Sequence, residues 1–210
     1  MPQVVPTITE ENPDVLASYA KKLAKFAPRI HVDFCDGIFA PHKLLALEEA
    51  QWPEKLQVDL HLMYKRPYEY LEAAIKNSAH TTIIHAEAEG DLLALVQLLH
   101  ESNLRAGVGL LPQSQPEDFV QLLEHAEHVL IFGGKLGWQG GDIDLRGIEK
   151  VARIKQINPR AEIAWDGGVD DVNIVQLINA GVDILNAGSF IKNAKKPGSA
   201  YAILQQIANR

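Results

Sequence analysis

Residues 3–34, QVVPTITEENPDVLASYAKKLAKFAPRIHVDF, hold two short apolar runs on either side of a longer segment with helical spacing. The runs over residues 3–8 and 29–34 are rich in β-branched residues, which favours β-strands. Between them, apolar residues recur every three or four positions over residues 13–27. This spacing is typical of an amphipathic helix, and the segment begins with a proline followed by an acid, as helices often do. The stretch therefore predicts a strand, a helix and a second strand.

The same alternation continues along the chain. The predicted strands cover residues 3–8, 29–34, 56–62, 80–86, 105–111, 128–133, 161–166 and 183–188. Segments of helical period cover residues 13–27, 67–78, 91–102, 116–126, 145–157 and 171–180. The link over residues 40–53 is the least regular and predicts at most a short helix.

Eight strands that alternate with helical segments, joined by right-handed crossovers, predict an α/β fold, a (β/α)8 TIM barrel, in which residues 1–210 form a single domain. An open doubly wound sheet is the alternative. However, the first predicted strand is not followed by the GxGxxG turn of a dinucleotide-binding fold.

The composition argues against several classes of partner. The net charge is −7 and no basic run is longer than AKK, so a nucleic-acid partner is disfavoured. A small anionic ligand stays compatible with this charge, because backbone amides can hold it. No apolar stretch approaches membrane-spanning length, the first residues do not resemble a signal peptide, and the single cysteine, Cys35, fits a reducing cytosol. We therefore expect a cytoplasmic protein with no nucleic-acid or membrane partner.

Polar side chains gather at the ends of the predicted strands. His31 and Asp33 are two positions apart and so point to the same side of one strand, while His61, His85 and Asp166 end three others. Active sites of (β/α)8 barrels lie at the C-terminal ends of the strands. We therefore expect these side chains to converge on one rim of the barrel.

Two imidazoles and two carboxylates at one rim are suitable ligands for a divalent metal ion. His31, Asp33, His61 and Asp166 together offer nitrogen and oxygen ligands that suit Zn, Fe(II), Mn or Co. Such an ion would also compensate the buried acids. A single strand-end histidine often only satisfies a hydrogen bond, so for His85 a structural role and a functional role stay open.

Three glycine-rich turns follow predicted strands. They are GGKLGWQGG at 133–141, DGG at 166–168 and AGS at 187–189. Loops after the last two strands of such barrels often bind phosphate through backbone N–H groups and the start of a short helix, for which Gly188, Ser189 and FIK are suited. The alternative is that these glycines only allow tight turns.

Five segments in order, HVDFCDGIFAP, DLHLM, HAEA, DGGV and AGSFI, resemble the ribulose-phosphate 3-epimerase family, and the resemblance spans nearly the whole chain. It implies a metal-dependent barrel enzyme of the pentose phosphate pathway, an isomerase of carbohydrate metabolism. By this resemblance His31, Asp33, His61 and Asp166 hold the metal ion. Asp33 and Asp166 are the acid-base pair on opposite faces of the substrate's C3, and the metal stabilises the enediolate.

The resemblance also implies a small sugar-phosphate substrate, most closely D-ribulose 5-phosphate converted to D-xylulose 5-phosphate, and a homo-oligomer. The implied substrate and phosphate contacts are Thr7, His61, Met63, Gly140, Gly141, Gly167, Gly168, Gly188 and Ser189.

Some positions depart from the family's pattern. Cys35 replaces a methionine, FAPH at 39–42 replaces FVPN and places His42 beside the site, and the loop LGWQGGD at 136–142 replaces PGFGGQ. For Cys35, a small buried hydrophobe is favoured over a reactive thiol. The changed loop leaves open a six-carbon ketose phosphate of the allulose 6-phosphate type as the substrate.

Two other classes of protein are alternatives to an epimerase. A decarboxylase or synthase of the orotidine monophosphate decarboxylase type would need a DxKxxD motif, but the stretch DFCDG at 33–37 has no lysine. A non-catalytic phosphate-binding barrel is the alternative that is not an enzyme, and the two retained aspartates disfavour it.

Overall fold

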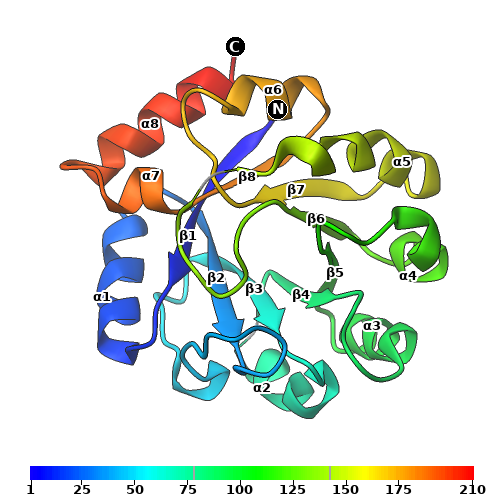
Figure 1. Cartoon of the computed structure of the whole chain (residues 1–210). Coiled ribbons are helices and arrows are strands. Elements are labelled where there is room, and N and C mark those ends of the chain that lie inside the picture. Colours follow the sequence, from blue (N-terminus) through cyan, green and yellow to red (C-terminus); the bar gives the residue numbers. More distant parts are fainter. Residues whose placement is uncertain (78, 142) are drawn as a thin grey trace.

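Eight parallel β-strands close into a barrel in which each strand pairs with the next along the chain and β8 pairs with β1 (Figure 1). The structure, a computed structural model, describes residues 1–77, 79–141 and 143–210. The strands are β1 Gln3–Thr9, β2 Arg29–Cys35, β3 Gln57–Met63, β4 Thr81–His85, β5 Arg105–Leu110, β6 His128–Phe132, β7 Glu162–Asp166 and β8 Ile184–Ala187. This architecture confirms the predicted (β/α)8 barrel, and the open doubly wound sheet is wrong.

Helices surround the barrel (Figure 1). The α-helices are α1 Pro13–Leu23, α2 Leu71–Lys76, α3 Leu92–Glu101, α4 Val120–Glu124, α5 Lys150–Ile157, α6 Ile174–Asn179, α7 Ser189–Lys192 and α8 Pro197–Ala208. The 3-10 helices are η1 Leu47–Glu49, η2 Pro67–Tyr70, η3 Pro116–Phe119 and η4 Leu145–Glu149. Within the described ranges, no helix combines the length and apolar content needed to cross a membrane.

Three of the predicted helices begin with a 3-10 segment before they become α-helical, at residues 67–70, 116–119 and 145–149. The helix predicted over 67–78 ends at residue 78, which lies outside the described residues, as does residue 142 of the loop after β6. The irregular link between β2 and β3 holds only η1, as predicted. The last helix, α8, lies beyond all of the segments that were predicted to be helical, so the sequence did not predict it.

Helix α1 shows how local sequence sets an element. The Asn12 side chain accepts hydrogen bonds from the backbone N–H groups of Asp14 and Val15, which satisfies two donors that the helix itself leaves free. Leu16, Ala20 and Leu23 lie three or four positions apart and are buried. Their spacing puts them on the face that packs against the strands.

The inside of the barrel is layered, because every second residue of a strand points inward. Val5, Ile83, Leu130, Ala164 and Ile184 form a small apolar cluster of their own. On the same strands, residues two positions before or after these five share their inward direction, and many of them are polar. The apolar layer therefore separates a polar layer at the N-terminal ends of the strands from another at the C-terminal ends.

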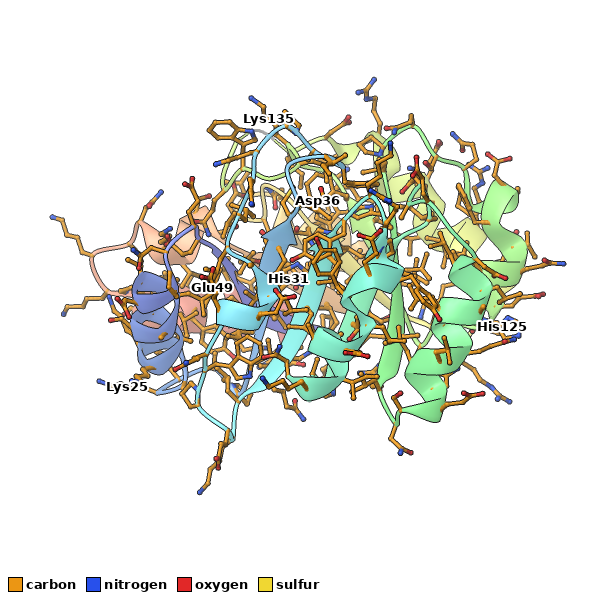
Figure 2. All side chains as sticks on the ribbon, turned by 90° about the horizontal axis from the view of Figure 1, so that it is seen from below. Lys25, His31, Asp36, Glu49, His125 and Lys135 are labelled. Carbon is orange, nitrogen blue, oxygen red and sulfur yellow. The ribbon has the colours of Figure 1, made fainter. Side chains whose placement is uncertain are left out.

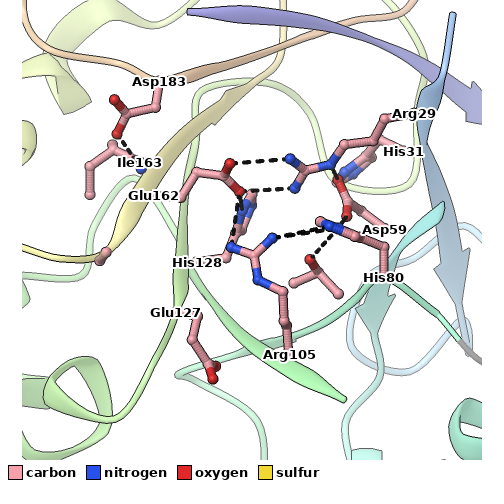
Figure 3. A network of polar contacts seen from close by, with 12 residues as sticks. Arg29, His31, Asp59, His80, Arg105, Glu127, His128, Glu162, Ile163 and Asp183 are labelled. Atoms are coloured by element: carbon pink, nitrogen blue, oxygen red, sulfur yellow. Dashed lines mark hydrogen bonds and ion pairs between the residues drawn. The ribbon is translucent and has the colours of Figure 1, made fainter. Parts of the chain in front are cut away.

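The N-terminal polar layer is a network of ion pairs (Figure 3). Arg29 donates to Asp59 at 2.7 Å and to Glu162 at 2.9 and 3.2 Å, and His128 lies 2.9 Å from the same Glu162 carboxylate. Arg29 is 3% exposed and Asp59 is fully buried. Since each buried charge here has an opposite partner, the network closes this end of the barrel without an isolated charge.

We expect Asp59→Asn to lower the free energy of unfolding by about 3 kcal/mol, because it removes one partner of a buried pair. Burial disfavours the charged form of Asp59, but His80 and Arg29 lower its pKa to about 2. The stabilisation is therefore present above pH about 4, near the unfolded pKa, and is lost as the pH falls toward 2. Urea denaturation at several pH values measures both effects.

The exposed pair Arg66–Glu69, with a separation of 3.2 Å, supplies the control. Glu69→Gln should leave the urea midpoint almost unchanged, because exposed pairs contribute little. An equal and small loss in both variants would show that the buried network does not stabilise the barrel.

Candidate metal centre and ligand pocket

Four buried side chains meet at the C-terminal ends of the strands. His31 and Asp33 come from β2, His61 from β3 and Asp166 from β7, and each offers one ligand atom within 4.8 Å of those of the other three. Asp33 and His61 are register partners on adjacent strands. His31 lies inside the barrel, while Asp36 and Lys135 lie on loops at the end toward which these side chains converge (Figure 2).

The nitrogen and oxygen atoms of this quartet face one another. Asp33 Oδ1 lies 2.8 Å from His61 Nδ1 and 3.2 Å from His31 Nε2. Asp166 Oδ2 lies 3.9 Å from each of these two nitrogens. Two imidazole nitrogens and two carboxylates thus surround one point, which is the ligand set that a divalent cation such as Zn, Fe(II), Mn or Co accepts.

The electrostatics of the quartet favour an added positive charge. Burial, and then the negative charge of Asp33, raise the pKa of Asp166. Burial also disfavours the charged form of Asp33, but His31 and His61 hold its pKa well below the usual range. Burial lowers the pKa of His61 to about 3, so this imidazole is neutral at physiological pH. A bound cation would let both carboxylates be ionised.

An unpaired nitrogen of His31 also fits a metal ion at this centre. His31 Nε2 is a buried polar atom that has no hydrogen-bond partner, although it points toward the two carboxylates. The other ring nitrogen of His31 lies 3.2 Å from the Asn186 amide. An amide can turn either its N–H or its oxygen toward that nitrogen, so Asn186 can support a His31 whose Nε2 is free to bind a cation.

Two residues of this centre were missed by the sequence analysis. Thr9 donates its hydroxyl to Asp33 Oδ2 at 2.6 Å, and Asn186 contacts His31. Thr9 is the register partner of Asp33, and Asn186 is that of Asp166. Their position on inward-facing strand ends was readable from the sequence, but a threonine or an asparagine there has too many other uses to be singled out.

A pocket opens above the quartet, between the centre and the glycine-rich loops. Both Asp33 and Asp166 line it. Of the predicted substrate and phosphate contacts, those on its lining are Thr7, Met63, Gly140, Gly167, Gly168, Gly188 and Ser189. Gly141 is exposed and His61 is buried below the pocket, and neither belongs to the lining.

The glycines after β7 are needed for packing as well. Gly167 and Gly168 have φ angles of 115° and 70°, in the region that disfavours other residues. A Cβ on Gly167 would lie 2.4 Å from the backbone nitrogen of Gly134 in the loop after β6. Tight turning therefore explains these two glycines, and phosphate binding would use the backbone that they expose.

The loop after β6 crosses the mouth of the barrel (Figure 1). Gln139 donates to the Thr7 carbonyl oxygen at 3.2 Å, and the Trp138 ring lies 4.4 Å from the His42 ring. His42 also lies 2.7 Å from Glu11 and is not on the pocket lining, so it contacts the covering loop rather than the pocket. Cys35 is buried beside Met63, in agreement with its interpretation as a small hydrophobe.

His85 contacts the quartet through His61 and does not line the pocket. Its Nε2 lies 2.8 Å from His61 Nε2, and its ring is fully buried. On the far side, its Nδ1 lies 3.4 Å from Glu87 Oε2. His85 therefore contacts a candidate ligand without lying among the four.

The chain matches the model of the ribulose-phosphate 3 epimerase family over residues 3–192. A ribulose-phosphate 3-epimerase of Helicobacter pylori is 30% identical over 185 residues, which cover 85% of each protein. Another, of Mycobacterium bovis, is 27% identical over 209 residues, 93% of this chain and 91% of that protein.

Among solved structures, 3-hexulose-6-phosphate synthase from Salmonella typhimurium has a TM-score of 0.74 at 15% identity, covering 99% of this chain and 98% of that one. This likeness concerns the barrel alone. The family model covers most of the chain and the sequence relatives bear the same family name, so the chain belongs to the ribulose-phosphate 3-epimerase family.

Proposed function

We propose that the protein inverts C3 of a ketose phosphate, with D-ribulose 5-phosphate and D-xylulose 5-phosphate as the preferred pair. The observation that carries this proposal is that Asp33 and Asp166 belong to one centre and both line one pocket. The relatives named as ribulose-phosphate 3-epimerases support the choice of reaction.

Inversion at a carbon needs a proton acceptor and a proton donor on opposite faces. Asp33 comes from β2 and Asp166 from β7, strands that are not neighbours in the barrel. A substrate bound between them would lose the C3 proton to one carboxylate and receive a proton from the other. Thr9 orients Asp33 through its hydroxyl, so this carboxylate has a defined direction.

His31, Asp33, His61 and Asp166 would hold a divalent ion. Such an ion supplies a Lewis acid that favours negative charge on the substrate's carbonyl oxygen when the adjacent carbon loses its proton. The unpartnered His31 Nε2 and the two close carboxylates support this assignment. Met63 would cover the substrate with an apolar surface, since it lines the same pocket.

The other end of the pocket suits a phosphate group. Gly140, Gly167 and Gly188 line it, with Ser189 at the start of α7. Backbone N–H groups in such loops bind phosphate in many barrels of this type. They would also explain how a chain with a net charge of −7 can bind an anion.

A six-carbon ketose phosphate is the second candidate substrate. The specific observation is the tilted contact between the Trp138 and His42 rings, whose centres are 4.4 Å apart, because both rings belong to the altered segments. This part of the cover departs from the family's pattern, whereas the metal and acid-base positions do not.

The direct test follows the protein and D-ribulose 5-phosphate by proton NMR in deuterated water. We expect D-xylulose 5-phosphate with deuterium at C3, because the carboxylates exchange their protons with solvent. Absence of both product and exchange, in protein shown to contain a divalent metal, would contradict the five-carbon substrate. The same experiment with D-allulose 6-phosphate would then test the six-carbon one.

We expect Asp33→Asn and Asp166→Asn each to lower kcat by about 100-fold to 10,000-fold, because each removes a group that transfers a proton. Steady-state turnover with D-ribulose 5-phosphate measures this. Asp171→Asn is the matched control, because Asp171 follows β7, the strand that ends with Asp166, but its side chain is exposed. Near-normal turnover in both variants of the centre would refute the two-aspartate proposal.

Removal of divalent ions with a chelator should lower the melting temperature by about 5–10 °C if the ion had been present at roughly 100 times its Kd. Turnover should fall with it, and added Zn²⁺ or Mn²⁺ should restore both. In the Asp33→Asn variant, the chelator should lower the melting temperature by less, because one candidate metal ligand has been removed. An unchanged melting temperature and turnover in the wild type would rule out the metal centre.

A further inference from the structure

His85 and Glu87 extend the candidate centre away from the pocket. His85 ends β4, and its Nε2 lies 2.8 Å from the Nε2 of His61. Its Nδ1 lies 3.4 Å from Glu87 Oε2. A carboxylate, an imidazole and a second imidazole thus form a line that ends at the candidate metal ligand His61.

The His85 ring is held in this direction. Its register partner is Gly109, and a Cβ there would lie 3.1 Å from His85 Cε1, between the two ring nitrogens. The Phe39 ring lies 4.9 Å away on another side. A side chain at position 109 would therefore press against the ring, and the glycine and Phe39 together limit which atoms its two nitrogens face.

Glu87 is also oriented. Its Oε1 accepts the backbone N–H of Leu111 at 2.9 Å and the hydroxyl of Ser114. Burial disfavours its charged form, but His85 and Ser114 lower the pKa of Glu87 overall. The carboxylate is therefore ionised at neutral pH, and only Oε2 is turned toward His85.

The hydrogen bonds as they stand assign the protons of the two rings. His61 Nδ1 lies 2.8 Å from Asp33 Oδ1 and carries the proton of that bond. A neutral His61 then has a bare Nε2, which accepts from the Nε2–H of His85. In this arrangement His85 Nδ1 and Glu87 Oε2 are both buried without a hydrogen-bond partner. Such unpaired buried atoms are unfavourable.

A cation at the centre reverses this assignment. When His61 Nδ1 gives its lone pair to a cation, the proton of the neutral ring must be on Nε2. This N–H donates to His85 Nε2, so the proton of His85 must move to Nδ1, where it donates to Glu87 Oε2. Each ring still carries one proton, so the number of protons is unchanged, and both unpaired atoms gain a partner.

We infer that His85 and Glu87 are positioning residues that select the metal-binding tautomer of His61. The inference rests on the metal centre of the proposed function and adds to it two residues that do not contact the ion. Groups that accept the second N–H of a metal-bound histidine commonly change metal affinity by about 10-fold to 100-fold.

Glu87→Gln tests the inference with almost no change of shape. Leu111 N–H and Ser114 hold the amide oxygen at the position of Oε1, so the NH₂ group is turned toward His85 Nδ1. This donor favours a bare Nδ1, which is the arrangement without metal. We expect the Kd for Zn²⁺, measured on metal-free protein by competition with a chelating dye, to rise by about 10-fold to 100-fold.

The tautomers give a readout independent of activity. In long-range ¹H–¹⁵N NMR spectra of the wild type, Zn²⁺ should move the proton of His61 from Nδ1 to Nε2 and that of His85 from Nε2 to Nδ1. Glu127→Gln is the control for affinity. Glu127 accepts a strand N–H from Ala106 and lies 2.9 Å from His100, but it does not belong to this line, so its variant should bind Zn²⁺ like the wild type.

Two results would overturn the inference and leave the proposed epimerase intact. One is a Glu87→Gln variant that binds Zn²⁺ as tightly as the wild type does. The other is a wild-type protein in which His85 keeps its proton on Nε2 after Zn²⁺ has bound. Protein that binds no divalent ion would overturn both the inference and the metal centre. A tautomer switch on Zn²⁺ without turnover of D-ribulose 5-phosphate would support the inference and count only against the proposed substrate.

Discussion

Closure of eight parallel strands turns every second side chain into the barrel, where a charge without a partner is costly. This constraint governs both polar layers of the molecule. Inward-facing residues near the N-terminal ends are Arg29, Asp59 and Glu162, which neutralise one another directly. The apolar layer above them has no charge to satisfy. The layer at the C-terminal ends has to meet the same requirement with different residues.

That upper layer lacks an arginine or lysine partner. In the described parts of the chain, Asp33 and Asp166 form ion pairs only with His31 and His61. The two carboxylates therefore share a site whose positive charge is supplied only by protonation of imidazoles or by a bound cation. A structural ion-pair layer would resemble the lower network. The upper layer instead has the composition of a metal centre that opens onto a pocket.

The support around the centre is as specific as the ligands. Thr9 and Asn186 contact Asp33 and His31, and the line from His85 to Glu87 reaches His61 from behind. Above the centre, the loop after β6 covers the pocket through Gln139 and through the contact of Trp138 with His42. The supporting residues are buried in the strands, while the cover is a loop, which is the part of a barrel in which substrate preference changes most readily.

The sequence by itself determined the eight strands, the closed barrel, the short link after β2 and the residues of the quartet. This was possible because strands have a side-chain period of two and helices one of about 3.6, and both periods can be recognised in the order of polar and apolar residues. It did not determine the 3-10 starts of three helices, nor the role of Thr9 and Asn186, because backbone hydrogen bonding and register depend on neighbours distant in the chain.

Only the tertiary structure decided that His42 turns to the covering loop and that Gly141 is exposed. It likewise decided that His85 touches His61 and Glu87. The physical reason is the same for each. Which atom a side chain faces depends on contacts between strands and loops that are far apart in the sequence. The local period of polar and apolar residues does not indicate these contacts.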